Sequence, residues 1–361
     1  MRASFFRIAI LAAIGAAAFH SSQAQSSIVS NTTSLPSQCN GSQETANQTL
    51  YVATRNKINV YTPGTTVPRL IITAGLAGVT QIATDKTGAV YASNFGTPNT
   101  YADSSVTQYA RGATSPSLTS TDGAFSASGV AVDSLGDVFA SSYYRNIISI
   151  YAPGGGHPSM QLQGGIVGPG LLAVANGRLY VGEAGSAQVL RFFPSGAPLS
   201  LQAPGTLPTG ALTFGGPFVV RPNGILYAGG AVIANDLGFE EFVNIFPGGS
   251  TSPRTSMVIS AGSNAQSPPF VAIAGNSLYV SASDINTVFQ YSVDPALNLT
   301  LVRAITDGLN QPGPLAVDGS QCLYLGNACG QVTVYAPGGT TPSQTINLPD
   351  FGAPVAVTVA P

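Results

Sequence analysis

A short segment with the character of a β-strand recurs seven times along this chain of 361 residues, and it constrains the fold more than any other feature of the sequence. In each copy a Leu or Val precedes a Tyr or Phe, and small or apolar residues follow. The copies begin at Leu50, Val90, Val138, Leu179, Leu226, Leu278 and Leu323. Their aromatic residues are separated by 40, 48, 41, 47, 52 and 45 positions. A period of this length indicates similar supersecondary units that stack on one another.

Two further segments accompany most copies of the repeat. One follows the first segment, contains an aromatic residue and runs into a Pro-Gly turn, as in residues 150–155. The other precedes the first segment and is mostly apolar, as in residues 130–133 and 315–318. Pro presets φ for the first turn position and Gly accepts a positive φ at the next. With a weaker strand after each Pro-Gly turn, every repeat contains four short strands, which is typical of a propeller blade.

The two ends of the repeat array complement each other. The first copy, at Leu50, lacks the apolar segment that precedes the other copies, and residues 352–360 resemble residues 313–318. A C-terminal strand paired with the first copy would complete that blade and remove an exposed sheet edge. The sequence therefore predicts an all-β, seven-bladed β-propeller of four-stranded antiparallel blades over residues 49–361, with six or eight blades as alternatives.

The repeated segments resemble those of a known family. The motif Ala316-Val317-Asp318, the segment 323–325 and the run Val-Thr-Val-Tyr-Ala-Pro-Gly-Gly-Thr at 332–340 are similar to those of secreted bacterial NHL-repeat propellers. They resemble more loosely the SMP-30/gluconolactonase-like and YVTN-type propellers. The resemblance covers residues 49–361 and concerns the blades, not a particular chemistry. NHL-type amidating lyases depend on several histidines, so the two histidines of this chain argue against that activity.

The N-terminus has the pattern of a secretory signal. Arg2 and Arg7 precede an apolar run over residues 8–19, and a small-x-small site ends at Ala24. The run has 12 residues, fewer than the ~20 that a membrane-spanning helix needs. We expect cleavage after residue 24, a flexible polar lead-in over residues 25–48, and a periplasmic or extracellular protein that does not insert into the membrane.

Composition excludes several classes of function. Only 8% of the residues are charged and the formal net charge is -2, so there is no basic excess for binding nucleic acid. His20 lies in the expected signal peptide, and His157 follows a Pro-Gly turn where we expect a solvated loop residue. One remaining histidine cannot build a three-histidine zinc site. We assign no catalytic residue and leave enzymatic activity open.

The gluconolactonase-like resemblance implies a divalent metal held by oxygen ligands near the axis. Candidate donors lie at the turns that leave the innermost strands: Asp85, Asp133, Asp318, Asn176, Asn223 and Asn276. Asp and Asn at such turns commonly bond to their own backbone, and their recurrence in successive blades favours that role. We therefore expect no cofactor, with Ca²⁺ or Mg²⁺ as the alternative.

The loops after the repeated aromatic segment differ from blade to blade, and all should emerge on one face. Variable loops on a regular scaffold commonly carry function. The second blade has a long loop at 94–103, and the fifth carries Asp236 and Glu241. The residues that we predict to bind a ligand are Tyr143, Tyr144, Arg145, Glu183, Phe239, Glu240 and Asp284. Alternatively, the charged residues only keep this rim soluble.

These features predict a non-catalytic binding or scaffold module that acts as a monomer. Its ligand would be a glycan, a peptide or a cell-wall fragment, and its partner a polysaccharide, peptide or protein at the loop face. One alternative is a metal-dependent lactonase-like or lyase-like enzyme with Glu183 or Asp284 near the axis. Another is a protein of surface adhesion or assembly.

Three cysteines in an exported chain leave one without a partner. Cys322 begins a strand of the last blade and Cys329 lies near the tip of its hairpin, so the two should be too far apart to bond. Cys39 precedes the first blade, which the ring places beside the seventh. We therefore predict a Cys39–Cys322 disulfide.

Overall fold

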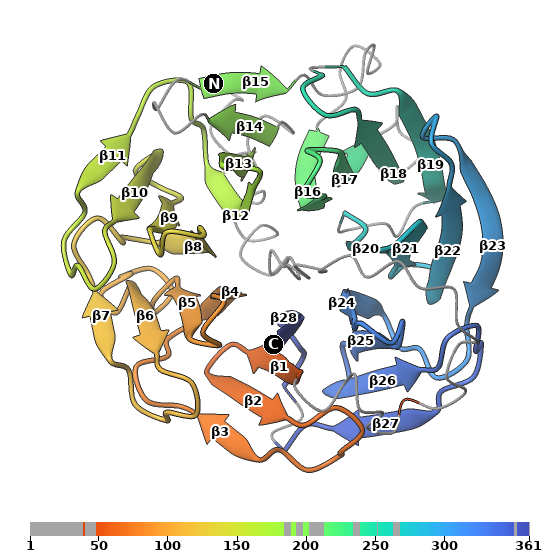
Figure 1. Cartoon of the computed structure of the whole chain (residues 1–361), viewed down its shortest axis with the longest axis horizontal. Coiled ribbons are helices and arrows are strands. Elements are labelled where there is room, and N and C mark those ends of the chain that lie inside the picture. The colour runs from red at the N-terminus through yellow and green to blue at the C-terminus, as the bar shows by residue number, and fades with distance from the viewer. Residues whose placement is uncertain are drawn as a thin grey trace, which may run out of the picture.

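The computed structural model is a ring of β-sheets (Figure 1). It describes Cys39 and residues 48–183, 189–192, 198–201, 213–233, 239–250, 252–262, 268–349 and 352–360. In these parts of the chain, no helix is both long and apolar enough to cross a membrane. The expected signal peptide and nearly all of the expected lead-in lie outside the described residues.

Seven four-stranded antiparallel sheets form the blades, which confirms the predicted seven-bladed propeller. From the innermost strand outward, blade 1 contains β28 (Ala356–Ala360), β1 (Thr49–Thr54), β2 (Lys57–Tyr61) and β3 (Leu70–Ile72). Blade 2 contains β4 (Val79–Thr84), β5 (Val90–Asn94), β6 (Ser105–Tyr109) and β7 (Leu118–Ser120). Blade 3 contains β8 (Ala127–Val132), β9 (Val138–Ser142), β10 (Ile147–Tyr151) and β11 (Met160–Leu162). Blade 4 contains β12 (Pro169–Ala175), β13 (Arg178–Glu183), β14 (Val189–Phe192) and β15 (Pro198–Leu201).

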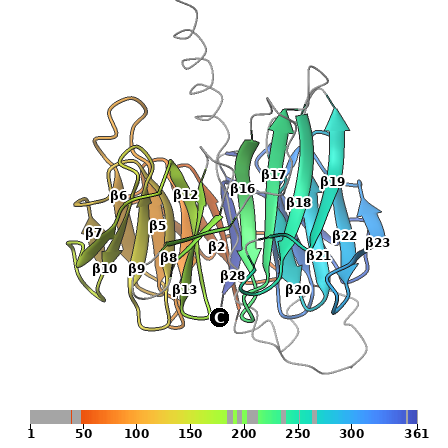
Figure 2. The ribbon, with the colours of Figure 1, turned by 90° about the horizontal axis from the view of Figure 1, so that it is seen from above.

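The remaining blades continue the same order. Blade 5 contains β16 (Thr213–Val220), β17 (Leu226–Ile233), β18 (Phe239–Phe246) and β19 (Thr255–Gly262). Blade 6 contains β20 (Val271–Ala274), β21 (Ser277–Ala282), β22 (Thr287–Val293) and β23 (Leu299–Ile305). Blade 7 contains β24 (Pro312–Val317), β25 (Leu323–Asn327), β26 (Gln331–Tyr335) and β27 (Gln344–Asn347). The strands of blade 5 are the longest that the structure describes, and Figure 2 shows them rising along one side of the ring.

Both ends of the repeat array meet in blade 1. The C-terminal strand β28 pairs antiparallel with β1, with Leu50 opposite Val359 and Val52 opposite Val357. It supplies the innermost strand that the first repeat lacks, and Figure 1 shows it near the centre of the ring. A disulfide joins Cys39 to Cys322, with a Cα–Cα distance of 5.9 Å, and so ties the chain before β1 to the start of β25. Cys329 is exposed and free.

Apolar side chains fill the spaces between neighbouring blades. One buried cluster joins Leu50 and Val357 of blade 1 to Tyr324 and Val332 of blade 7. Because both faces of a blade are covered, inner strands such as β1 and β28 are buried along their whole length. The repeated tyrosines are buried in these clusters, as expected for residues that pack between blades.

A single polar side chain connects three inner strands near the axis. Gln81 on β4 accepts hydrogen bonds through Oε1 from the backbone N–H groups of Val130 (3.1 Å) and Leu172 (3.0 Å). Its Nε2 donates to the Leu172 carbonyl oxygen (2.9 Å). The amide of Gln81 thus links blades 2, 3 and 4. Nothing in the repeat pattern distinguishes this glutamine from other polar strand residues.

Gly129 on β8 lies directly against the backbone of the neighbouring inner strand β12. A Cβ at this position would be 2.2 Å from the Gly170 carbonyl oxygen and 2.9 Å from Ser141 Oγ. We expect Gly129→Ala to lower the free energy of unfolding by about 2–3 kcal/mol, because backbone must move to make room. Urea denaturation measures the loss. Gly156→Ala is the matched control, since the nearest atom is 3.8 Å away, and a similar loss in both variants would contradict the steric explanation.

Candidate functional site

The hairpins between the second and third strands of the blades emerge at one end of the propeller, which we call the loop face. Antiparallel order places the connections between successive blades at the same end, because each blade starts there with its innermost strand. The described part of this face includes residues 95–104 and 143–146 of blades 2 and 3, and residues 283–286 of blade 6.

Five aromatic rings gather on the loop face where blades 2 and 3 meet. This aromatic cluster consists of Phe95, Tyr101, Phe125, Tyr143 and Tyr144. The Tyr101 ring centroid lies 5.2 Å from that of Phe95, 5.5 Å from that of Phe125 and 5.0 Å from that of Tyr144. Tyr143 and Tyr144 are also 5.0 Å apart and pack edge to face. The structure therefore brings the two tyrosines predicted from the sequence together with three rings that were not predicted.

Polar groups border the aromatic cluster. The Tyr101 hydroxyl donates a hydrogen bond to the Tyr144 hydroxyl at 3.1 Å, and Tyr144 remains 40% exposed. The guanidinium of Arg145 lies 4.9 Å from the ring centroid of Phe125. Burial, followed by the hydrogen bond shared with Tyr101, raises the pKa of Tyr144, so its hydroxyl is neutral at physiological pH. The cluster thus offers ring faces, neutral hydroxyls and one cation to a ligand.

Hydrogen bonds from backbone N–H groups to serine hydroxyls connect the three loops of the cluster. The Ser126 N–H donates to Ser104 Oγ at 3.0 Å, and the Tyr144 N–H donates to Ser126 Oγ at 3.1 Å. Tyr101 and Ser126 both have positive φ angles, 53° and 51°. Such angles are unfavourable for residues with a Cβ, and they persist where the surroundings hold them. The hydrogen bonds therefore tie the loops that carry the rings to one another.

A second group of polar residues lies between blades 5 and 6 on the same face. Glu241 on β18 and Asp284 in the β21–β22 hairpin form what we call the acidic pair, and Ser260 on β19 lies between them. The Ser260 hydroxyl is 2.7 Å from Asp284 Oδ2 and 3.5 Å from Glu241 Oε2. Burial, followed by the charge of Asp284, raises the pKa of Glu241 to about 8.

Two predicted ligand residues occupy other settings. Glu183 is buried at the end of β13, and its Oε1 accepts a hydrogen bond from the Val167 N–H at 2.6 Å. The structure thus does not place Glu183 on the accessible rim, where we expected it, because this carboxylate holds the connection between blades 3 and 4. Glu240 is partly buried and precedes Glu241, so the two side chains leave β18 on opposite faces. Phe239 begins β18, and its side chain lies outside the described part, as does Asp236.

The recurrent Asp residues organise the turns between the first two strands of their blades. Oδ1 of Asp85 accepts hydrogen bonds from the N–H groups two and four residues ahead, and Asp133 and Asp318 do the same. Oδ2 of Asp318 also accepts the Tyr324 hydroxyl at 3.0 Å. Asn223 caps its turn through a bond from the Ile225 N–H. The turn role favoured from the sequence therefore holds for these residues.

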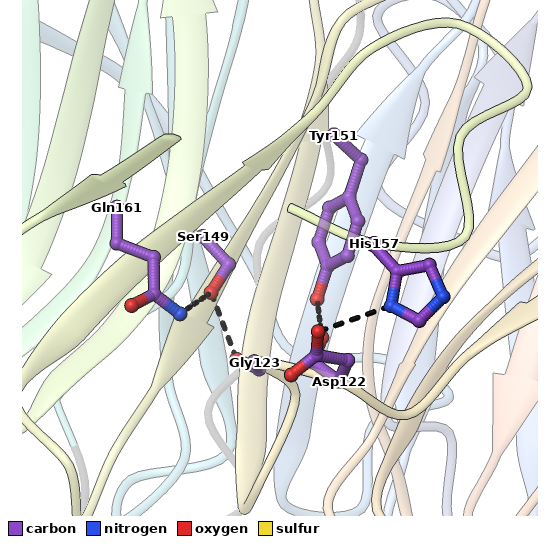
Figure 3. A network of polar contacts seen from close by, with 6 residues as sticks. All are labelled: Asp122, Gly123, Ser149, Tyr151, His157 and Gln161. Atoms are coloured by element: carbon purple, nitrogen blue, oxygen red, sulfur yellow. Dashed lines mark hydrogen bonds and ion pairs between the residues drawn. The ribbon is translucent and has the colours of Figure 1, made fainter. Parts of the chain in front are cut away.

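His157 lies on the outer part of blade 3, away from the clusters described above. Its Nδ1 is 3.1 Å from Asp122 Oδ2, and both side chains are largely exposed. Figure 3 shows this pair beside Tyr151, whose hydroxyl donates to the Asp122 carbonyl oxygen at 2.6 Å. Nearby, Ser149 donates to the Gly123 carbonyl oxygen, so the network fastens the link from blade 2 against blade 3. Within the described residues, no three His, Cys, Asp or Glu side chains are grouped so that they could hold a metal ion.

Sequence reasoning missed Phe95, Tyr101, Phe125 and Ser260. The loop at 94–103 was a signal for the first two, because it carries aromatic residues and is longer than a connection between two adjacent strands needs to be. Phe125 and Ser260 gave no signal, since the partners of their side chains lie 19 or more residues away in the chain.

Comparison with known proteins supports the fold and leaves the family open. No family model matches the chain, and no curated protein matches it. A 6-phosphogluconolactonase-like protein from Bacteroides fragilis shares 12% identity, covers 89% of this chain and 100% of its own, and superposes with a TM-score of 0.68. A functionally unknown protein from Desulfotomaculum acetoxidans shares 14% identity over 86% of this chain and 98% of its own, with a TM-score of 0.61.

A third solved structure is the β-propeller domain of a protein from Myceliophteria thermophila. It shares 11% identity, covers 75% of this chain and 87% of its own, and has a TM-score of 0.58. At these identities the likeness concerns the fold alone. The chain is a β-propeller, and its resemblance to NHL-repeat proteins stays a prediction.

Proposed function

We propose that the protein is an exported, non-catalytic binding module whose aromatic cluster binds a polysaccharide or a cell-wall glycan. The observation that carries this proposal is the exposed ring of Tyr144, held among four further rings on the loop face. The expectation of export rests on the pattern of residues 1–24.

The chemistry of the cluster suits a sugar better than a charged ligand. A sugar ring has apolar C–H faces that stack on aromatic rings, and its edges carry hydroxyl groups that bond to tyrosine hydroxyls and arginine. Tyr101, Tyr143 and Tyr144 supply hydroxyl groups, and Arg145 supplies a donor at the border. Because hydrogen bonds already connect these loops, less conformational entropy is lost when a ligand docks.

The test is binding of glycans by the purified protein and by Tyr144→Ala. We expect the protein to bind at least one class of bacterial or plant polysaccharide fragment. Tyr144→Ala should weaken that binding at least about tenfold, because an exposed aromatic platform often dominates such a site. Isothermal titration calorimetry with the fragments selected on a glycan array measures both affinities.

Leu135→Ala is the matched control. Leu135 is 78% exposed and lies in the β8–β9 turn, at the opposite end of the propeller from the aromatic cluster. This variant should bind like the wild type. Absence of binding to any glycan, or equal affinity in Tyr144→Ala, would refute the proposal. Hydrolysis of a lactone by the purified protein would instead favour the lactonase-like alternative.

A further inference from the structure

We infer that Glu241, Ser260 and Asp284 form a binding site for a hard divalent cation, with Ca²⁺ preferred over Mg²⁺, between blades 5 and 6. The site is separate from the aromatic cluster, so this inference does not depend on the proposed function.

The first observation is the convergence of three oxygen-bearing side chains from separate strands and loops. Glu241 lies on the third strand of blade 5, Ser260 on its outer strand and Asp284 in a hairpin of blade 6. A β-bulge supports this arrangement. Glu241 pairs with Ser260 while Phe242 pairs with Val258, so Ile259 is the extra residue. Bulges of this kind redirect neighbouring side chains and are common next to functional sites.

The second observation is a shortage of partners for buried oxygens. Glu241 is 0% exposed, and neither its Oε1 nor Oδ1 of Asp284 has a hydrogen-bond partner among the described residues, although both atoms are buried. Buried carboxylate oxygens are nearly always hydrogen-bonded, paired with a cation or bound to a metal. The Ser260 hydroxyl has one proton and bonds best to Asp284, so it cannot satisfy both carboxylates.

The chemistry of the three oxygen-bearing side chains determines which kind of ligand they would bind. Two carboxylates and a hydroxyl are hard oxygen ligands, and together they neutralise a divalent charge. Ca²⁺ accepts irregular geometry and fills its remaining positions with carbonyl oxygens and waters, whereas Mg²⁺ requires a near-ideal octahedron. Ligands that come from a bulged strand and a hairpin fit the irregular case.

The experiment is a thermal-shift and calorimetric titration of the full chain with CaCl₂ and with MgCl₂, after treatment with a chelator. At pH 8 and a Ca²⁺ concentration near 100 times its dissociation constant, we expect the melting temperature to rise by about 4 °C. Mg²⁺ should bind at least about tenfold more weakly than Ca²⁺.

Glu241→Gln and Asp284→Asn keep the size of the side chains and remove one charge each. Either variant should abolish the thermal shift, whereas Asp307→Asn, at an exposed position after β23, should keep it. Each variant is first shown to unfold cooperatively, so that a folding defect is not mistaken for lost binding. A wild-type protein that no divalent cation stabilises between pH 6 and pH 9 would overturn the inference. An unchanged shift in Glu241→Gln would overturn it as well.

Discussion

Without divalent cations, the wild-type protein is expected to lose stability as pH rises from 4.5 towards 8. Replacing Glu241 by glutamine is expected to remove most of this loss. Burial holds the folded-state pKa of Glu241 at about 8, against 4.5 for the free side chain. The folded protein therefore keeps a proton that the unfolded chain releases. The stabilisation is complete below pH 4.5 and is lost as pH rises through about 8. For a shift of this size the loss is roughly 3–5 kcal/mol.

Urea denaturation in chelator-containing buffer across this range measures the effect. Glutamine cannot ionise and keeps the shape of a protonated glutamate, so the pH dependence of Glu241→Gln should be nearly flat through this window. Glu240→Gln is the control and should follow the wild type, because Glu240 is less buried and lies on the other face of β18. Equal slopes for wild type and Glu241→Gln would show that this carboxyl is not held protonated in the fold.

Removing the Cys39–Cys322 disulfide is expected to lower the free energy of unfolding by about 4 kcal/mol. The bond spans 283 positions of sequence, so it restricts nearly the whole unfolded chain. It also joins the chain before β1 to blade 7, where the two ends of the repeat array meet, and both of its residues are buried in the cluster between blades 1 and 7. Cys39→Ala tests this by urea denaturation under non-reducing conditions.

Cys329→Ser is the matched control, since Cys329 is exposed and unbonded. Its stability should stay within about 0.5 kcal/mol of the wild type. Peptide mapping without reductant should recover residues 39 and 322 in one linked peptide pair. Three free thiols in the folded protein, or equal stability of the two variants, would contradict the prediction.

The fold could be predicted from the sequence because every blade of a propeller has the same local structural requirements. Each blade needs apolar strands of a few residues, tight turns with Gly, Pro, Asn or Asp, and an aromatic residue to fill the space between blades. These requirements are local, so they leave a periodic pattern in the chain. The turn role of Asp85, Asp133 and Asp318 was predictable for the same reason, since each bonds to backbone within four residues.

The candidate sites could not be predicted in the same way, because their residues come from different parts of the chain. Tyr143 and Tyr144 stood out as aromatic residues in a hairpin, but their neighbours Tyr101 and Phe125 come from other loops. Glu183 also stood out as a charge near a loop, yet the adjoining blade connection buries it against the Val167 N–H. Whether a loop residue is exposed depends on what folds over it, which no local pattern records.

The sequence by itself determined the β-propeller architecture, favoured seven blades over six or eight, and predicted the strand that completes the first blade, because periodicity and turn chemistry act over a few residues. Only the tertiary structure decided which side chains meet: the link from Gln81 to blades 3 and 4, the aromatic cluster and the acidic pair. Those contacts join residues of different blades, and their energies depend on burial, on distance and on partners that the ring brings together.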